Sequence, residues 1–450
     1  MSDTVFIHSQ DQLRQLAQDV LRFAKETGGT DAAVEFSEGS GLSVSVRKGK
    51  IETIEQNKDK GMGVTVFIGQ KRGNASTSDF SPQALRATVE AAYNIARFTA
   101  EDDCAGLADE DMLEKHPKDL KLCYPWLISA AEAVELAQRC EAAAFAVDPR
   151  ITNSEGAGVY AQQSHFVAAN TRGFIGGYPY SRHTLSVAPI AGKGRNMQRD
   201  DWYSSMRNPK HLAKPETVGR YAAERALARL NARKLDTRKC PVLFEAPLAA
   251  GLLGAFVQAV SGGALYRKST FLLDSLGQAV FAPHIQIVED PHQIGAVGSS
   301  PFDDEGVRTS RRDVVKNGVV QGYFLSSYSA RKLGMKTTGN AGGSHNLSLT
   351  SSLTKPTDNF TAMLKKLDTG LLVTELMGDG VNYVTGDYSR GASGYWVERG
   401  VIQYPVEEIT IAGNMKDMLR QIVAIGNDRL IRGTKQTGSI LLESMMVAGG

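Results

Sequence analysis

The chain has 450 residues, of which 42% are hydrophobic and 22% are charged, a composition typical of a globular protein with two or three domains. Its formal net charge of +2 gives no electrostatic basis for binding nucleic acid or a membrane surface. Four dispersed cysteines without a CxxC motif exclude a disulfide framework and a cysteine-based zinc ribbon, and we find no signal peptide or long apolar span, so we expect a reduced cytoplasmic protein.

The first predicted unit has the order helix, strands, helix. Apolar residues at a 3.6-residue period predict a helix over residues 11–26, with Ser9 as its cap, and Ser81-Pro82 opens a second helix over 83–98. Lys48-Gly49-Lys50 is a turn between two strands, and Gly61 and Gly63 indicate a bend or a close backbone approach. The predicted strands cover residues 32–36, 42–47, 51–56 and 63–68.

The second predicted unit repeats this order after a linker, residues 101–126, that we expect to wrap the first unit. Ser129 and Glu132 form a capping box for a helix ending at Val147, and a further helix covers 215–230 after a charged loop over 192–214. Five strands lie between these helices, at residues 150–154, 158–161, 165–170, 173–180 and 183–190. The shared order predicts an internal duplication.

The last unit is rich in short strands and follows a basic, polar boundary over residues 231–239. Asn317-Gly318 is a strong type I′ hairpin signal, and Arg399-Gly400 is a weaker one. Helices are expected over 358–367 and 415–423, and strands over 285–288, 314–315, 319–325, 371–376, 395–398, 401–404 and 409–412. The predicted fold is α+β: duplicated helix–strands–helix units over 1–125 and 126–235, and a β-rich C-terminal domain over 236–450.

A buried helix is predicted near the start of this C-terminal domain. Val242-Leu243-Phe244 is a buried strand, Pro247 fits a first helical turn, and residues 248–260 carry no charge. A helix that is apolar all round must be buried on most sides. It carries no side chain that could perform chemistry.

Metal-ligating patterns are weak. No two of the eight histidines are four or five residues apart, so the helical zinc-protease pattern is missing. His284 and His292, with Glu289 and Asp290 between them, lie at opposite ends of a predicted strand, and we interpret them as solvated or capping side chains. We interpret Asp303-Asp304-Glu305 as a solvated turn rather than a cation site. We predict no metal ligand and no catalytic residue in this chain.

Three polar clusters contain candidate substrate-binding residues. Arg267 and Lys268 follow the buried helix and either hold a carboxylate or peptide carbonyl or complement a helix dipole. His345 lies in a glycine-rich loop, where it either approaches a substrate or caps a turn. Asp387 and Arg390 lie between glycines in a loop that either lines a cleft or simply joins two strands.

Several long segments together resemble the TldD/PmbA family, and in particular its PmbA (TldE) branch. They are YRKSTFLLDSLG (266–277), SPFDDEGV (300–307), SYSARKLG (327–334), GDYSRGA (386–392) and ITIAGN (409–414). The resemblance covers essentially the whole chain. It implies a cytosolic peptidase pair, long described as modulator of DNA gyrase, that cuts unfolded or modified peptides, including peptide-antibiotic precursors and an antitoxin.

The chain differs from the metal-binding branch at the positions of the metal ligands. That branch carries His-Glu-x-x-x-His on the buried helix and a later cysteine as third zinc ligand, whereas the matching window here, give or take one residue, is residues 254–259, GAFVQA. No cysteine follows Cys240. We therefore expect no cofactor in this chain, with zinc held by a TldD-like homologue that is its partner.

The resulting hypothesis is a non-catalytic subunit of a metalloprotease heterodimer, with a possible homodimer when the partner is absent. The C-terminal domain would supply the interface and bind extended peptides by strand addition. One alternative is a peptidase active on its own, with a relocated site around His284, His292 or His345. Another is a modulator that binds DNA gyrase, although the near-zero net charge argues against direct DNA contact.

Overall fold

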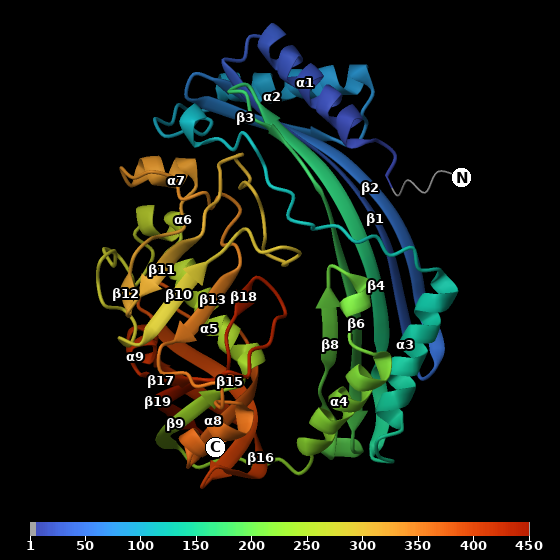
Figure 1. Ribbon diagram of the computed structural model, residues 1–450, viewed down its shortest axis with the longest axis vertical. Coiled ribbons are helices and arrows are strands. Elements are labelled where there is room, and N and C mark those ends of the chain that lie inside the picture. The colour runs from blue at the N-terminus through green and yellow to red at the C-terminus, as the bar shows by residue number, and fades with distance from the viewer. Residues whose placement is uncertain (1–5, 450) are drawn as a thin grey trace.

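The computed structural model describes residues 6–449 and shows a curved sheet that runs along one side of a compact C-terminal unit (Figure 1). The first two units together build this eight-stranded sheet, in the order β3-β2-β1-β4-β6-β7, with β5 paired to β4 and β8 to β6. Its strands are β1 (Asp31–Arg47), β2 (Lys50–Ile68), β3 (Lys71–Thr77), β4 (Ile151–Asn170), β5 (Ile175–Gly176), β6 (Pro179–Ala191), β7 (Gln198–Arg199) and β8 (Trp202–Met206).

Four helices cover the convex face of the sheet, one pair at each end (Figure 1). They are α1 (Gln10–Glu26), α2 (Pro82–Phe98), α3 (Ala130–Phe145) and α4 (Pro215–Ala228). Strand β1 serves both pairs: Val34 and Phe36 pack in the core beneath α1 and α2, and Val44 and Val46 pack beneath α3 and α4. These positions are an even number of residues apart, so they share one face of the strand. The predicted helix–strands–helix duplication is confirmed.

The helix starts agree with the predicted caps. Ser9 accepts a hydrogen bond from the backbone N–H of Gln12 and forms a capping box with it, and Ser129 forms the same box with Glu132. Ser81 caps α2, and Pro82 is its first residue. Each cap satisfies backbone N–H groups that the helix itself leaves without a partner.

The strands are longer than predicted. Residues 32–36 and 42–47 belong to one strand, β1, and residues 51–56 and 63–68 to β2. Likewise the predicted strands over 150–154, 158–161 and 165–170 are parts of β4, which begins one residue later, at Ile151. Polar residues interrupt the apolar alternation but do not break the strand pairing. Buried Glu38 of β1, for example, lies opposite His165 of β4, with 3.2 Å between Glu38 Oε2 and His165 Nε2. The hydrophobic pattern alone could not show this pairing.

Three further expectations are wrong. Strand β3 was not predicted, and the predicted loop over 192–214 contains β7 and β8. The close backbone approach expected at Gly61 and Gly63, as the alternative to a bend, does not occur: β1–β2 pairing continues through both, and a Cβ at either position would meet nothing within 4 Å. By contrast, Lys48 and Gly49 both have positive φ in the β1–β2 turn, as a tight turn requires.

The C-terminal unit has two sheets, with orders β12-β11-β10-β13-β18 and β16-β15-β14-β9-β19-β17; an additional β16–β19 pairing closes five strands of the second sheet into a ring. The strands are β9 (Arg238–Phe244), β10 (Ile285–Glu289), β11 (Arg312–Lys316), β12 (Val319–Val320), β13 (Leu347–Ser351), β14 (Gly370–Met377), β15 (Asp387–Glu398), β16 (Val401–Asn414), β17 (Ile422–Ile425), β18 (Lys435–Gln436) and β19 (Ile440–Ala448). The helices are α5 (Ala246–Ala259), α6 (Gly262–Tyr266), α7 (Ser327–Lys332), α8 (Phe360–Leu367) and α9 (Met415–Arg420).

Both predicted hairpins of this unit are present. Asn317 and Gly318 have φ of 51° and 78°, as a type I′ turn requires, and Arg399 and Gly400 have φ of 52° and 73°. The predicted strands over 395–398 and 401–404 continue into the long β15–β16 ladder. The β-rich character of the C-terminal domain is confirmed.

The linker over residues 101–126 contacts the C-terminal unit as well as the first unit. Arg331 of α7 donates hydrogen bonds to the carbonyl oxygens of Cys104, Gly106 and Leu107, and the Glu114 N–H donates to the carbonyl of Gly306. The linker therefore runs between the curved sheet and the C-terminal unit (Figure 1). Within residues 6–449, no helix is both long and apolar enough to cross a membrane.

Candidate functional site

Helix α5 forms the centre of the C-terminal unit, as its apolar sequence predicts. Strand β9 leads into it, and Pro247 lies in its first turn. Seven of its residues are buried, and all of them except Ala246 belong to the unit's main core, which also contains residues from both sheets. They are Ala246, Ala249, Leu252, Leu253, Ala255, Phe256 and Ala259. A helix placed in this way is rigid, and any group on its remaining face is held in a fixed position.

The remaining face of α5 borders a pocket of about 540 Å³, which we call the α5 pocket. From α5 it receives Gly251, Gly254 and Gln258, which are three and four residues apart and therefore share one side of the helix. The opposite wall comes from the end of β14, the following loop and β15. These segments contribute Leu376, Asp379, Gly380, Val381, Tyr383, Tyr388 and Arg390.

The polar groups of the α5 pocket are mainly hydrogen-bond donors. Burial raises the pKa of Tyr388 to about 12, so its hydroxyl keeps its proton at neutral pH. Within the described chain this hydroxyl and the Nε of Arg390 are buried without a hydrogen-bond partner. Buried polar groups normally have partners, and those without one mark a place where a ligand can supply it. A peptide carbonyl or carboxylate offers the acceptor that both groups lack.

Lys435 of β18 lies beside the same face of α5. A Cβ built on Gly254 would be 3.8 Å from Lys435 Cε, and burial lowers the pKa of this lysine. Nothing in the sequence pattern singled out Lys435, because its position depends on the parallel pairing of β18 with β13, which joins segments almost ninety residues apart. The face of α5 therefore has a cationic side chain beside it as well as Arg390 across the pocket.

The residues of α5 at 254–259 do not fit a zinc ion. Gly254, Ala255 and Ala259 offer no donor atom, and Gln258 offers a carboxamide, whereas Zn²⁺ sites in proteins use Cys, His, Asp or Glu. Among the residues that the structure describes, Asp379 is the one carboxylate that lines the pocket. Across residues 6–449, no group of three or more His, Cys, Asp or Glu side chains is arranged to hold a metal ion.

His345 lies in a different place, held by a buried carboxylate. Glu289 Oε1 accepts a hydrogen bond from the His345 backbone N–H at 2.8 Å and lies 3.2 Å from His345 Nδ1, while Glu289 Oε2 accepts from Arg312 Nε at 2.7 Å. Burial alone would raise the pKa of Glu289, but these groups outweigh it and hold the pKa at about 2. His345 therefore anchors its glycine-rich loop to β10.

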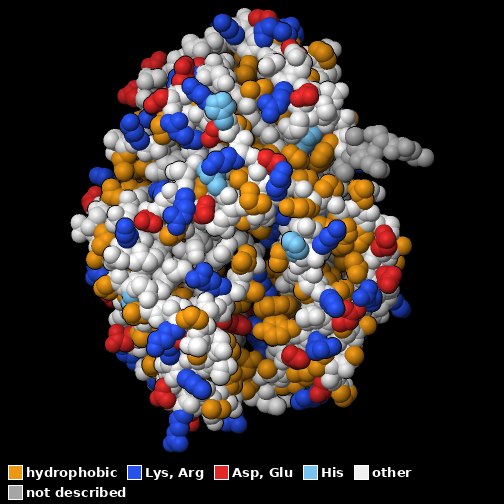
Figure 2. Space-filling view, in the orientation of Figure 1, with side chains coloured by type: hydrophobic (Ala, Val, Ile, Leu, Met, Phe, Trp, Pro, Cys, Tyr) orange, Lys and Arg blue, Asp and Glu red, His pale blue; other side chains and the backbone are white. Residues whose placement is uncertain are grey.

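His345 also lines a hollow of about 270 Å³ between the C-terminal unit and the curved sheet, with Tyr178, Arg207 and Asp304. The space-filling view shows a deep furrow between these two parts of the molecule (Figure 2). The predicted solvated turn at 303–305 is wrong for Asp303. This residue is 4% exposed, and it accepts backbone hydrogen bonds from Glu305, Val307 and Ala341.

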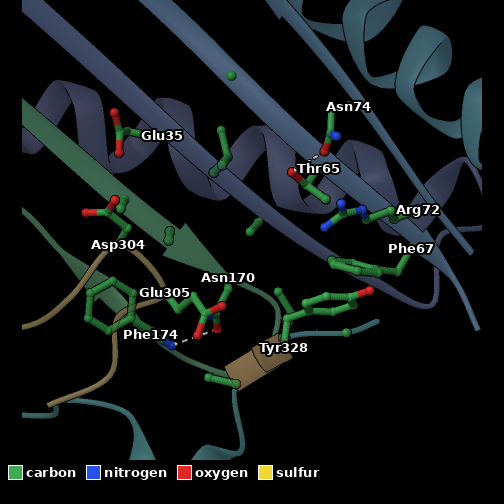
Figure 3. A pocket seen from close by; sticks show the side chains of 18 of the residues that line it. Glu35, Thr65, Phe67, Arg72, Asn74, Asn170, Phe174, Asp304, Glu305 and Tyr328 are labelled. Carbon is green, nitrogen blue, oxygen red and sulfur yellow. Dashed lines mark hydrogen bonds between the residues drawn. The ribbon is translucent and has the colours of Figure 1, made fainter. Parts of the chain in front are cut away.

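A further pocket of about 380 Å³ lies between the curved sheet and the C-terminal unit (Figure 3). Glu35 of β1 and Asp304 lie toward one end of it, and Arg72 of β3 and Tyr328 of α7 lie toward the other (Figure 3). Burial raises the pKa of Glu35, and the negative charge of Asp304 raises it further. This pocket brings together acidic groups from segments far apart in the chain, which sequence inspection did not connect.

The other candidate residues lie outside these pockets. Arg267 and Lys268 are exposed at the end of α6, where Arg267 donates a hydrogen bond to the Tyr266 hydroxyl at 3.0 Å. Asp387 is the exposed first residue of β15, and its carboxylate accepts hydrogen bonds from Thr385 and Asn414, which lower its pKa. Of the five predicted binding residues, only Arg390 reaches the α5 pocket.

His284 and His292, the other histidines of the alternative peptidase site, lie apart from His345 and from the α5 pocket. His284 Nδ1 lies 2.8 Å from Ser351 Oγ, and its Nε2 lies 2.8 Å from the Ile422 carbonyl oxygen. His292 Nε2 lies 3.1 Å from Thr309 Oγ1. The two flank β10 at opposite ends, as predicted, and Glu289 between them serves His345 instead.

Comparisons with known proteins agree with this architecture. Three family models of the PmbA/TldA metallopeptidases match: domain 1 over residues 32–96, the central domain over 123–230 and the C-terminal domain over 237–449. The chain is 48% identical to Metalloprotease PmbA of Escherichia coli O157:H7, with 97% of each chain covered. It is 46% identical to the Metalloprotease PmbA homolog of Haemophilus influenzae, with 100% of this chain and 99% of the relative covered.

Two further matches extend this comparison. A Metalloprotease TldD homolog from the same Haemophilus influenzae strain is 23% identical, with 82% of this chain and 80% of the relative covered. A crystal structure of a Bacteroides thetaiotaomicron protein described as a candidate modulator of DNA gyrase superposes with a TM-score of 0.92, at 26% identity, covering 99% of this chain and 100% of that one. The chain thus belongs to the PmbA/TldD metallopeptidase family.

Proposed function

We propose that this chain is the non-catalytic subunit of a zinc peptidase pair, in the PmbA (TldE) branch of the family, and that its partner is a TldD-like homologue that holds the zinc. The observation that carries the proposal is the pocket face of α5. The resemblance expects two histidine ligands and a glutamate at residues 254, 255 and 259, give or take one residue, and Gly254, Ala255 and Ala259 stand there instead. Such a face can line a substrate cleft, but it cannot activate water through a metal.

The partner's identity is supported by the relatives. One Haemophilus influenzae strain has a PmbA homologue that is 46% identical to this chain and a TldD homologue that is 23% identical to it. The two kinds of chain therefore exist side by side in one organism, and this chain is closer in sequence to the first. We propose the same pairing here, in the cytoplasm, without a role for membrane or direct nucleic-acid binding.

We propose extended peptides, unfolded or modified, as the substrate class, including peptide-antibiotic precursors and antitoxins. The α5 pocket supports this choice, because Arg390 Nε and the Tyr388 hydroxyl lack acceptors and every peptide unit supplies one. Recognition through backbone carbonyl groups depends little on side-chain sequence. A shared cleft between two subunits would then place this donor set opposite the partner's zinc.

The purified chain alone is expected to hold no stoichiometric zinc and to cleave no peptide. The measurement is elemental analysis of the protein after dialysis, together with mass spectrometry of an unfolded protein substrate incubated with it. Adding the TldD-like homologue of the same organism should produce cleavage, and both chains should elute together. One zinc per chain in the isolated protein, or cleavage by it alone, would contradict the proposal.

Arg390→Ala is expected to weaken peptide use by the assembled pair about tenfold or more, because a hydrogen bond to a charged group contributes about 1.5–3 kcal/mol. The effect should fall on KM, since this residue would bind substrate without taking part in bond cleavage. Arg399→Asn, at an exposed turn of positive φ, is the matched control and should leave KM unchanged. Equal losses in both variants would argue against a binding role for Arg390.

The relatives are named as metalloproteases, and a second candidate function is therefore a metalloprotease whose own chain carries the active site. His345 would be its centre, because it lines the hollow of about 270 Å³ described above. His345→Ala separates the two proposals. It would abolish a peptidase activity of the isolated chain, whereas in the partner model the isolated chain has no activity to lose.

A further inference from the structure

The α5 pocket contains unfilled space directly over the helix. A Cβ built on Gly251 would meet no atom within 4 Å, and one built on Gly254 would meet only Lys435, at 3.8 Å. Neither glycine has a positive φ, so the backbone of α5 does not require glycine at these positions. The two glycines therefore keep this part of the helix face open, in a pocket of about 540 Å³ that is large enough for a small ligand.

Two hydrogen-bond donors across this space are buried without an acceptor. Tyr388 is 3% exposed, and within residues 6–449 neither its hydroxyl nor the Nε of Arg390 has a hydrogen-bond partner. Burial raises the pKa of Tyr388 and of Tyr383, and the nearby charge of Arg390 opposes both rises. The guanidinium therefore lies close to both phenol groups, and all three side chains line the pocket. A ligand at this point would supply acceptors that the fold lacks.

Positive charge predominates around the pocket. Arg390 lines it, and the side chain of Lys435 lies over Gly254 on the helix side. Among the lining residues that the structure describes, the one carboxylate is Asp379, which is exposed and lies beyond ion-pair distance of Arg390. An anion bound here would pair with a partly buried cation, and hydrogen bonds that involve charged groups are about twice as strong as neutral ones.

A carboxylate matches these groups better than other acceptors do. Its two oxygens can accept from the guanidinium and from the Tyr388 hydroxyl at the same time, and its single charge matches that of Arg390. Every peptide unit supplies an acceptor, but a neutral carbonyl would leave that charge without a counter-ion. A phosphate carries a charge of about −1.5 to −2, whereas Arg390 is the one cation among the described lining residues.

The rest of the pocket wall is largely apolar. It includes Leu248 and Leu252 of α5, Leu376 of β14 and Val381. An apolar side chain next to the carboxylate can therefore be removed from water in the same pocket. A free C-terminus on an apolar residue offers both features at once, whereas an aspartate or glutamate side chain offers only the carboxylate.

We infer that the α5 pocket binds a carboxylate of a peptide, and that a free C-terminus on an apolar residue fits it best. Arg390 and Tyr388 donate hydrogen bonds to the carboxylate oxygens, and Lys435 adds a second positive charge. Gly251 and Gly254 leave room for the residue that carries the carboxylate. The inference rests on the proposed function, because it takes the ligand to be a peptide, and it adds a defined chemical group that this chain recognises.

Calorimetric titration of the isolated full-length chain with three matched peptides tests the inference. The peptides are acetylated Ala-Ala-Ala-Leu with a free C-terminus, the same peptide with a C-terminal amide, and acetylated Ala-Glu-Ala-Leu with a C-terminal amide. The free acid should bind at least tenfold more tightly than its amide, with a Kd between about 10 µM and 1 mM. If the glutamate peptide binds as tightly as the free acid, the pocket accepts a carboxylate from either source.

Other outcomes of the titration would overturn the inference. One is equal binding of all three peptides, and another is no binding at peptide concentrations up to about 5 mM. Inorganic phosphate that binds more tightly than the acid peptide would overturn it as well, because the pocket would then be built for a more highly charged anion.

Two variants place the binding in the α5 pocket. Tyr388→Phe removes only a buried hydroxyl without a partner, so it should fold normally and bind the acid peptide about tenfold more weakly, with the amide unchanged. Gly251→Leu fills the open space and should abolish binding of both peptides, while Leu favours the helix more than Gly does. Arg399→Asn, at an exposed turn, is the control and should bind like the unaltered chain. Unchanged binding of the acid peptide by either pocket variant would overturn the inference.

Failure of the proposed function would look different. Stoichiometric zinc in the isolated chain, or cleavage by it, would contradict the non-catalytic role but would leave the preference for the acid peptide intact. Equal binding of acid and amide peptides by a chain that still supports cleavage by the assembled pair would overturn the carboxylate site alone.

Discussion

Glu289→Ala is expected to lower the free energy of unfolding by about 3–5 kcal/mol, the usual cost of removing one partner from a buried charge network. Glu289 is 1% exposed and accepts hydrogen bonds from Arg312 Nε, Asn340 Nδ2 at 2.8 Å and the backbone N–H of His345. Alanine would leave the Arg312 charge and these donors without their acceptor. The measurement is the midpoint of urea unfolding, followed by circular dichroism.

The matched control is Glu135→Ala, which removes an exposed glutamate of α3 and should change stability by less than about 0.5 kcal/mol. Glu289→Gln keeps the shape of the side chain and one acceptor oxygen. Its free energy of unfolding should therefore fall by an amount between those expected for Glu135→Ala and Glu289→Ala. Equal stability of Glu289→Ala and the unaltered chain would mean that water or a relaxed loop replaces the carboxylate.

The same network predicts an acid dependence. The pKa of Glu289 is held at about 2, below the value of about 4.3 for an unperturbed glutamate, so folding favours its ionised form. Its contribution is complete above about pH 4.3 and disappears as the pH falls toward 2. The difference in stability between the unaltered chain and Glu289→Ala should therefore shrink over that range.

The features that could be predicted from the sequence are those that depend on neighbouring residues. Ser9 and Ser129 cap helices through bonds to the third residue of each helix, and Asn317-Gly318 makes its turn through its own backbone angles. The buried character of α5 follows in the same way from its composition. In each case the necessary contacts lie within a few residues of the chain.

The features that were missed depend on contacts between distant segments. Glu38 interrupts the apolar pattern of β1, and only its contact with His165, 127 residues away, explains a continuous strand. Lys435 reaches α5, and Glu289 reaches His345, across similarly long stretches of chain. Arg390 was identified because it lies in a polar segment between glycines, but the same reasoning selected Asp387, whose side chain contacts Thr385 and Asn414 instead.

Arg225→Ala should lower the free energy of unfolding by about as much as Glu289→Ala. It removes a charged side chain at the junction between the middle and C-terminal units. Arg225 of α4 donates to Glu245 Oε1 at 2.8 Å and to Asp200 Oδ1 at 3.2 Å, and its guanidinium lies 5.3 Å from the Trp202 ring centre. Burial would lower the pKa of Arg225, but the two carboxylates outweigh it and raise that pKa. Because Glu245 directly precedes α5, this cluster ties α5 to the middle unit.

Without Arg225, Glu245 would be a buried carboxylate without its main counter-charge, at a cost of about 3–5 kcal/mol in urea unfolding at pH 7.5. Burial already raises the pKa of Glu245, and Arg225 opposes that rise. In the variant the pKa should rise further, so folding takes up a proton there and is favoured as the pH falls. The stability lost at pH 7.5 should therefore be partly regained at pH 5.5, and adding Glu245→Gln should restore stability at pH 7.5. A loss that is independent of pH and of Glu245 would instead assign the effect to the packing of Arg225 on Trp202.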